Sequence, residues 1–124
     1  MLEVAMTTIF VLEDDSDLLE LYTEALAFRG YTVECTNSAE KAINMIRTNA
    51  CTLDVAVLDM SMPGLPGSAV VEFIRTESHC PDLPIIVISC DEDYRPLLKT
   101  ARVDFMQKPV TLTDLYHAVA RHTM

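Results

Sequence analysis

Polar and charged side chains follow four of the five short apolar runs in this sequence. Three acidic residues follow the first run, and an aspartate, a serine and a lysine follow three later ones. If the runs are parallel strands of one sheet, these side chains converge on the crevice at the carboxyl ends of the strands, where open α/β sheets bind ligands. The residues are Glu13, Asp14, Asp15, Asp59, Ser89 and Lys108.

A cluster of carboxylates limits the chemistry of such a crevice. Bringing Glu13, Asp14 and Asp59 together is opposed by like-charge repulsion, so the cluster must either take up protons or bind a cation. Oxygen ligands favour a hard ion such as Mg²⁺ or Mn²⁺, and Mg²⁺ typically uses one or two carboxylates with water and phosphate oxygens. A carboxylate can also act as the nucleophile that forms an aspartyl-phosphate.

The apolar runs predict five strands. Three runs are continuously apolar, which is typical of strands buried on both faces, and two alternate, which indicates strands nearer the sheet edges. The continuous runs are Thr8–Leu12, Val55–Leu58 and Pro84–Ile88, and the alternating ones are Tyr31–Cys35 and Val103–Gln107.

Segments of helical period separate the strands and predict five helices. The fourth must be short, about two turns from near Asp93 to Thr100, because the interval from Ser89 to Lys108 leaves little room and Pro96 is tolerated only in a first turn. Strict alternation gives an α/β fold, a doubly wound (βα)5 parallel sheet. The other helices are expected from Ser16 or Asp17 to Gly30, from Asn37 or Ser38, from Gly67 to about Glu77, and from Thr111 or Thr113.

Composition narrows the class of protein. The chain has 124 residues, half of them hydrophobic, which suits one compact domain. A formal net charge of −10 argues against direct nucleic-acid binding. The apolar runs are too short to cross a membrane, and residues 1–6 lack the features of a signal peptide. We therefore expect a cytoplasmic domain over residues 7–124, preceded by a short leader over residues 1–6.

Four cysteines stand at positions 35, 51, 80 and 90 without a CxxC spacing. A zinc site is not expected from this pattern. In the cytoplasm the thiols should stay reduced. The expectation for Cys35 and Cys51 is packing in the core.

The motifs together resemble the receiver domains of response regulators in two-component and phosphorelay signalling, in particular single-domain chemotaxis regulators. The resemblance covers nearly the whole chain after Met6 and implies a flavodoxin-like strand order 2-1-3-4-5. It is carried by Val11-Leu12-Glu13-Asp14-Asp15, Leu58-Asp59-Met60-Ser61-Met62-Pro63-Gly64, Ile88-Ser89, and Val103-Asp104-Phe105-Met106-Gln107-Lys108-Pro109.

The resemblance assigns roles to the acidic residues. Asp59 is similar to the phosphoryl acceptor, Asp14 to the direct metal ligand and Glu13 to the outer acidic partner that acts through water. The backbone carbonyl of Ser61 would also face the metal. An alternative takes Asp14 and Asp15 as the acidic pair, whereas the first assignment leaves Asp15 as a loop residue.

The resemblance assigns three more roles. Ser89 is similar to the switch hydroxyl that bonds a phosphoryl oxygen, and Lys108 to the lysine that pairs with the acceptor or its phosphate. The bond from Lys108 to Pro109 is usually cis in this family. Phe105 stands at the position of the switch aromatic; the alternative is an ordinary half-buried strand residue.

The implied function is phosphoryl transfer from a histidine kinase or phosphotransfer protein to Asp59, followed by a change in a partner-binding face. A homodimer through the face of the fourth helix, fifth strand and fifth helix is one open possibility. Cys90 and Arg102 depart from the family pattern: Cys90 should crowd the approach to the phosphoryl group, and Arg102 replaces a small apolar residue.

Competing functions are weaker. A phosphatase of the haloacid-dehalogenase type needs an acid two residues after the nucleophile, where Ser61 stands, so a turnover enzyme is not expected. Three glycines provide neither a GxGxxG nor a P-loop for nucleotides. A degenerate receiver that binds partners without phosphorylation stays open, as does the choice between a stand-alone domain and part of a longer protein.

Overall fold

Five parallel strands and four helices make up the described part of the chain, residues 7–61, 66–90 and 101–123 of a computed structural model. The sheet has the strand order β2-β1-β3-β4-β5, and every neighbouring pair is parallel. This confirms the doubly wound sheet and the order 2-1-3-4-5. The elements are β1 (Thr8–Leu12), α1 (Ser16–Phe28), β2 (Thr32–Thr36), α2 (Ala39–Asn49), β3 (Val55–Asp59), α3 (Gly67–Thr76), β4 (Ile85–Ser89), β5 (Asp104–Gln107) and α5 (Leu112–Thr123), with a short 3₁₀ helix over Ala50–Thr52.

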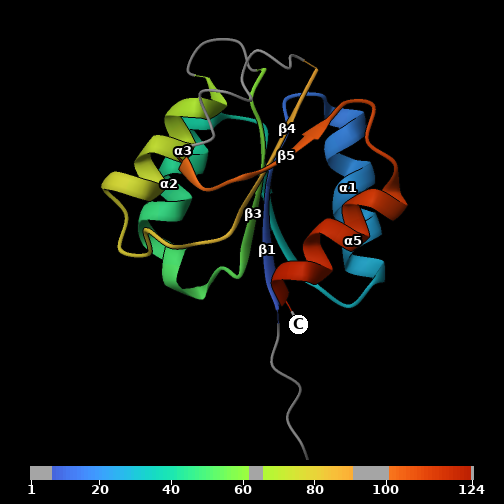
Figure 1. Cartoon of the computed structure of the whole chain (residues 1–124), viewed down its shortest axis with the longest axis horizontal. Helices are drawn as coiled ribbons and strands as arrows, with labels where there is room; N and C mark the ends of the chain where they lie inside the picture. The colour runs from blue at the N-terminus through green and yellow to red at the C-terminus, as the bar shows by residue number, and fades with distance from the viewer. Residues whose placement is uncertain (1–6, 62–65, 91–100, 124) are drawn as a thin grey trace, which may run out of the picture.

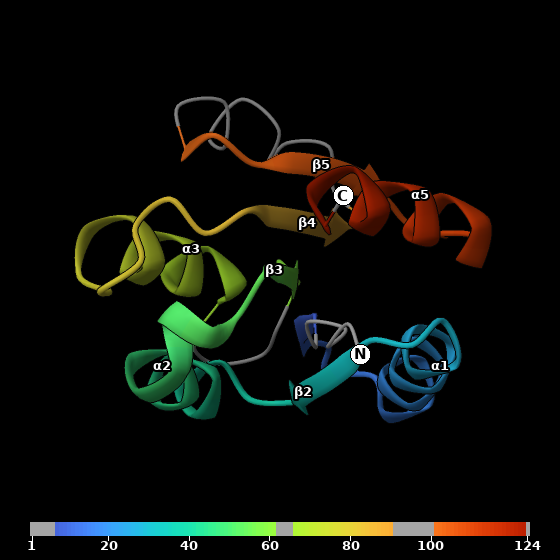
Figure 2. The ribbon, with the colours of Figure 1, turned by 90° about the horizontal axis from the view of Figure 1, so that it is seen from below.

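The helices form two layers around the sheet. Figures 1 and 2 show α1 and α5 on one face and α2 and α3 on the other. Side chains alternate between the faces along each strand. Ile9 and Val11 of β1 therefore pack with α1 and α5, whereas Phe10 and Leu12 pack with α2 and α3. The apolar runs of β3 and β4 are buried throughout, as two-sided coverage requires.

The predicted strands agree with the structure to within a residue or two. β1 has the predicted bounds, β2 is displaced by one residue, and β2 and β5 lie at the two edges, as their alternating patterns indicated. The fourth predicted helix, near Asp93 to Thr100, lies outside the described residues. Among the helices that are described, none is long and apolar enough to span a membrane.

The cap of α1 corrects one prediction. Asp15, rather than Ser16 or Asp17, is the N-cap, and its Oδ1 accepts the backbone N–H groups of Asp17 at 2.9 Å and Leu18 at 3.1 Å. An aspartate satisfies the otherwise unpaired first N–H groups of a helix. Asp15 is therefore more than a loop residue. The helix ends at Phe28 with Arg29 as its C-cap, and Gly30, where the helix was predicted to stop, follows with a φ of 94° in the left-handed region.

Two cysteines meet at the amino ends of β3 and β4. Cys51, after α2, and Cys80, after α3, form a disulfide with a Cα–Cα distance of 5.6 Å. The expectation that all four thiols stay reduced is therefore wrong for this pair. Cys35 and Cys51 are exposed, so the expectation that they pack in the core is also wrong. Sequence spacing cannot show which loops the fold brings together.

Arg75, near the end of α3, ties together the loops at the same end of the sheet. Its guanidinium donates to the carbonyl oxygens of Pro81, Leu83, Ala101 and Arg102 at 2.7–3.1 Å. Arg102 has a φ of 57°, an unfavourable conformation for a residue with a side chain. The contact with Arg75 helps to offset that cost immediately before β5.

Candidate functional site

Three carboxyl groups converge at the carboxyl ends of β1 and β3. Glu13 and Asp59 are each 1% exposed, whereas Asp14 lies at the surface. One oxygen from each of the three groups lies within 4.8 Å of the others. This arrangement arises because β1 and β3 are hydrogen-bonded neighbours and end at the same level of the sheet. The structure thus brings together Glu13, Asp14 and Asp59, as the sequence predicted.

Asp15 has a structural role at the start of α1. Its side chain caps α1, and its backbone N–H donates to Oε2 of Glu13 at 3.2 Å. The metal-competent cluster within the described residues contains Glu13 and Asp14 but not Asp15. The geometry therefore favours the Glu13–Asp14 pair over the Asp14–Asp15 pair.

Lys108 enters the cluster from the end of β5. Its Nζ lies 2.9 Å from Oε1 of Glu13 and 3.5 Å from Oδ2 of Asp59, and its side chain is 14% exposed. Its backbone N–H donates to the carbonyl oxygen of Ser89 at 2.9 Å. The bond from Lys108 to Pro109 is cis, as the resemblance implied. The nearest carboxylate to the ammonium is that of Glu13, which sequence reasoning did not anticipate.

The charge state of the cluster follows from its burial. Burial raises the pKa of Asp59, and hydrogen bonding of its protonated form to Glu13 and Asp14 raises it further, to about 7. Burial also acts to raise the pKa of Asp14, but side-chain hydrogen bonding with Asp59 and Glu13 outweighs it and lowers that pKa. Without a cation, the Asp59 carboxyl is therefore protonated below about pH 7 and only partly protonated near neutral pH.

The pKa of Lys108 moves in the opposite sense to what burial alone would cause. Burial acts to lower it, but the hydrogen bond to Glu13 and the attraction of Asp59 raise the pKa above its usual value. The ammonium is thus charged at neutral pH. It provides a fixed positive charge beside the carboxylates.

The donor atoms fit a hard divalent cation. They are all oxygens, and Oδ2 of Asp59 is buried without a hydrogen bond from the described residues. Its other oxygen, Oδ1, accepts the backbone N–H of Ser61 at 3.0 Å, which fixes the carboxylate plane. A fixed carboxylate whose second oxygen accepts no hydrogen bond from the described residues is suited to ligate Mg²⁺ or Mn²⁺.

Gly67 is a residue that the sequence interpretation treated only as the start of a helix. A Cβ at this position would overlap the backbone carbonyl oxygen of Asp59. The first turn of α3 can approach the end of β3 because this residue has no side chain. Only three glycines occur in the chain, and this scarcity was the one signal available in the sequence.

Ser89 and Phe105 lie on neighbouring strands, with Ser89 opposite Gln107, two residues beyond Phe105. Ser89 closes β4 and is completely buried. Phe105 of β5 is half-buried, stands opposite Val87 of β4 and packs against the α2–α3 side of the core. These positions fit a switch hydroxyl and a switch aromatic, and equally fit the alternative of an ordinary strand residue for Phe105.

Cys90 lies at the edge of the cluster. It is exposed and lines a cavity of about 340 Å³ together with Lys108 and Pro109. The side chains of Leu18, Tyr22 and Val110 complete the wall. A thiol at this place borders a path towards the ammonium of Lys108, which is compatible with the predicted crowding.

Comparisons with known proteins agree with this geometry. A family model described as "Response regulator receiver domain" matches residues 9–120. The chain is 32% identical over 111 residues to the uncharacterized transcriptional regulatory protein YrkP of Bacillus subtilis, covering 90% of this chain and 47% of that protein. It is 29% identical over 110 residues to the two-component response regulator ARR12 of Arabidopsis thaliana, covering 86% of this chain and 18% of that protein.

Solved structures share the fold. The receiver domain of the hybrid histidine kinase CckA superimposes with a TM-score of 0.80 at 26% identity, covering 94% of this chain and 99% of that one. The chemotaxis protein CheY4 of Vibrio cholerae has a TM-score of 0.85 at 21% identity, covering 95% and 99%. The chain belongs to the receiver domain family of response regulators. It spans less than half the length of the two curated relatives named above.

Proposed function

We propose that this receiver domain accepts a phosphoryl group on the Asp59 carboxylate in a reaction that depends on Mg²⁺ or Mn²⁺. The convergence of Glu13, Asp14 and Asp59 with the ammonium of Lys108 carries the proposal. A bound divalent cation would neutralise charge on the incoming phosphoryl group. Asp14 and Asp59 would hold it directly, with the Ser61 carbonyl, and Glu13 would act through water.

The chain's own residues prepare the acceptor. The Ser61 N–H fixes Oδ1 of Asp59, and Oδ2 lies 3.5 Å from the ammonium of Lys108. Lys108 would move from Glu13 towards the phosphoryl oxygens, and the Ser89 hydroxyl would bond another of them. Movement of Ser89 would leave room for Phe105 to turn inward and alter the surface around β5.

The phosphoryl donor would be a histidine kinase or a histidine phosphotransfer protein, and the output partner another protein. We infer a cytoplasmic protein that does not bind nucleic acid through this domain and that does not turn over a substrate. A dimer through the surface of the fourth helix, β5 and α5 is a further hypothesis. Its fourth helix lies outside the described residues.

Labelling with acetyl phosphate tests the proposal. Intact-mass spectrometry should show one added phosphoryl group with Mg²⁺, none in EDTA and none for Asp59→Asn, which keeps the shape but removes the nucleophile. Asp14→Asn should slow labelling because it weakens the cation site. Asp15→Asn, which removes the same charge one residue away, should label at nearly the wild-type rate.

Two outcomes would contradict the assignment: full labelling of Asp59→Asn, or a full rate in EDTA. If Asp14→Asn and Asp15→Asn slow labelling equally, the acidic pair is Asp14 and Asp15 rather than Glu13 and Asp14. Absence of labelling in a folded, metal-binding protein would favour the degenerate receiver that binds its partners without phosphorylation.

A further inference from the structure

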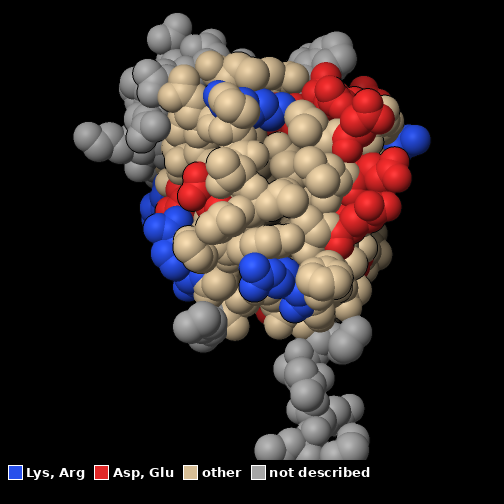
Figure 3. Space-filling view, turned by 90° about the vertical axis from the view of Figure 1, so that its right-hand side faces the viewer, with Lys and Arg blue, Asp and Glu red and all other residues tan. Residues whose placement is uncertain are grey.

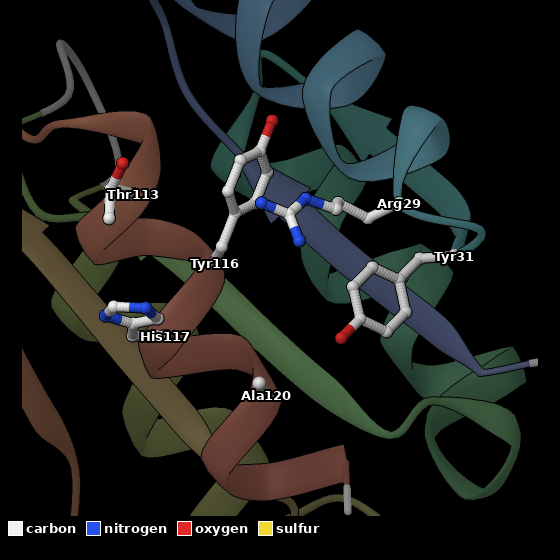
Figure 4. A pocket seen from close by; sticks show the side chains of 6 residues that line it. All are labelled: Arg29, Tyr31, Thr113, Tyr116, His117 and Ala120. Atoms are coloured by element: carbon white, nitrogen blue, oxygen red, sulfur yellow. The ribbon is translucent and has the colours of Figure 1, made fainter.

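A second cavity, with a more polar lining, lies between the carboxyl end of α1 and α5, away from the acidic cluster. Its volume is about 200 Å³. The thirteen residues of α1 separate it from Asp14 by roughly 20 Å at 1.5 Å per residue. It is lined by Arg29, Tyr31, Thr113, Tyr116, His117 and Ala120 (Figure 4).

The lining follows from two local patterns. Arg29 is the C-cap of α1, and the turn through Gly30 carries the chain to Tyr31. The four lining residues of α5 stand at i, i+3, i+4 and i+7 from Thr113, which places them on one side of the helix. The cavity is therefore built by a helix end and a helix face, both fixed by the core.

Arg29 provides the positive charge of the cavity. Its guanidinium lies over the ring of Tyr116, 4.0 Å from the ring centroid, as Figure 4 shows. Within the described residues no carboxylate lies within ion-pair distance of it, whereas Arg102 pairs with Asp82 and Arg121 pairs with Asp104. Arg29 is thus held by an aromatic ring and not neutralised by an acid.

Stacking prepares the guanidinium for an anion. The ring of Tyr116 covers one face, and the N–H donors of a guanidinium point outward in its plane, where they match the two oxygens of a carboxylate or phosphate. The hydroxyl of Tyr31 lies 3.3 Å from Oγ1 of Thr123 in α5, a hydrogen bond that fixes another wall. Thr113 and His117, one turn apart, add a hydroxyl and an imidazole as donors.

The Arg29 cavity lies on a face of the molecule that also carries many acidic side chains. On the face formed by α1 and α5, Figure 3 shows most of the acidic side chains towards the right-hand side and several separate basic groups, one of them near the lower edge. Exposed acids of α1 stand mainly in its first two-thirds, at Asp17, Glu20 and Glu24. An anion is repelled by much of this acidic chain, so an anion that binds here must be recognised by local groups.

We propose that this cavity binds a small oxyanion on a short organic stem, with Arg29 as its two-pronged partner and Thr113 and His117 as further donors. Its volume is below the roughly 300 Å³ of ordinary ligand pockets, which excludes a whole nucleotide. The stem would lie along Tyr31 and Ala120. The oxyanion is a carboxylate or a phosphate ester. The site is independent of phosphorylation at Asp59.

Titration with propionate and with ethyl phosphate tests the proposal and distinguishes a carboxylate ligand from a phosphate ester. Amide resonances of the ¹⁵N-labelled Asp59→Asn protein are followed without Mg²⁺ at constant ionic strength, which suppresses binding at the acidic cluster. We expect saturable shifts at Tyr31, Tyr116 and His117 for at least one ligand, and the tighter ligand identifies the oxyanion.

Arg29→Gln should weaken that binding at least tenfold, and Arg29→Lys, which keeps the charge but not the fork, several-fold. Arg121→Gln, which removes a positive charge from α5 outside the cavity lining, should leave it unchanged. Failure of both ligands to saturate below about 50 mM, or equal affinity of the wild-type residue and Arg29→Lys, would overturn the proposal. Equal weakening by Arg121→Gln would do so as well, because it would show binding to net charge only.

Discussion

The two ends of the sheet contribute in opposite ways to the stability of the fold. At the carboxyl end, Glu13, Asp14 and Asp59 are held within 4.8 Å of one another, an arrangement that like-charge repulsion destabilises. At the amino end, the Arg75 contacts and the Cys51–Cys80 disulfide tie the loops before β3, β4 and β5 together. The comparison indicates that contacts at the amino end stabilise the fold, whereas the carboxylate cluster at the carboxyl end destabilises it.

Reduction of the disulfide should have the largest effect. A bond across 29 residues of chain is expected to stabilise the fold by about 3–4 kcal/mol in the chain-entropy model. Dithiothreitol should therefore lower the melting temperature by roughly 10 °C. Calorimetry measures this, and the Cys51→Ser/Cys80→Ser protein serves as the control, since it should not respond to the reductant. If dithiothreitol leaves the wild-type melting temperature unchanged, the disulfide does not stabilise the amino end of the sheet.

Replacement of Asp59 should reveal the cost at the other end. Its folded pKa of about 7 exceeds the unfolded value of 3.8, so the protonated carboxyl stabilises the fold below pH 4 and this contribution is lost as the pH rises through 7. Asp59→Asn does not ionise and should be more stable than wild type by about 2–4 kcal/mol at pH 8 without metal, and no more stable at pH 3.5. Urea unfolding at both pH values gives the result, and a gain that grows towards low pH would contradict it.

Arg75→Met should destabilise the fold by about 2–3 kcal/mol, because it leaves several partly buried carbonyl oxygens without donors. Its matched control is Arg121→Met, which removes an exposed contact of 3.4 Å to Asp104 and should cost less than about 1 kcal/mol. Denaturant unfolding compares the two. Similar losses would mean that the Arg75 contacts are no more than surface interactions.

Two glycines, Gly67 beside Asp59 and Gly30 after α1, allow a matched pair of substitutions. Gly67→Ala should cost about 2 kcal/mol and slow labelling of Asp59, since the new methyl group meets the Asp59 carbonyl. Gly30→Ala meets nothing within 4 Å but retains a φ of 94°, so it should cost about 1 kcal/mol and leave labelling unchanged. Unfolding and acetyl phosphate labelling are measured on both. If Gly67→Ala is labelled at the wild-type rate, the close approach of Gly67 to the Asp59 carbonyl does not affect the phosphorylation of Asp59.

Cys90→Ala should have the smallest effect on stability, within about 0.5 kcal/mol, because the residue is exposed. Its effect should instead be kinetic: faster labelling by acetyl phosphate, faster loss of the phosphoryl group, or both. Mass spectrometry over time measures the two rates. Equal rates for both proteins would make Cys90 an inert residue at the edge of the cavity.

Local sequence signals determined the architecture of this protein. Continuous apolar runs identified the central strands and alternation identified the edges, because strand burial is a property of neighbouring residues. The positions of Glu13, Asp14, Asp59, Ser89 and Lys108 at the ends of such runs were sufficient to place them at one edge of the sheet. Helix starts were predicted less well, since Ser16, Asp17 and Asp15 are all competent caps.

Tertiary structure decided the contacts between distant segments. It selected Asp15 as the cap and left Asp14 in the cluster, placed Lys108 nearer to Glu13 than to Asp59, and joined Cys51 to Cys80. The Lys108 and disulfide contacts join side chains that lie far apart along the chain, and the distances from Lys108 to Glu13 and Asp59 differ by only 3.5 − 2.9 = 0.6 Å. Hydrophobic period carries no such information, because it specifies which face of an element is buried and not which partner it meets.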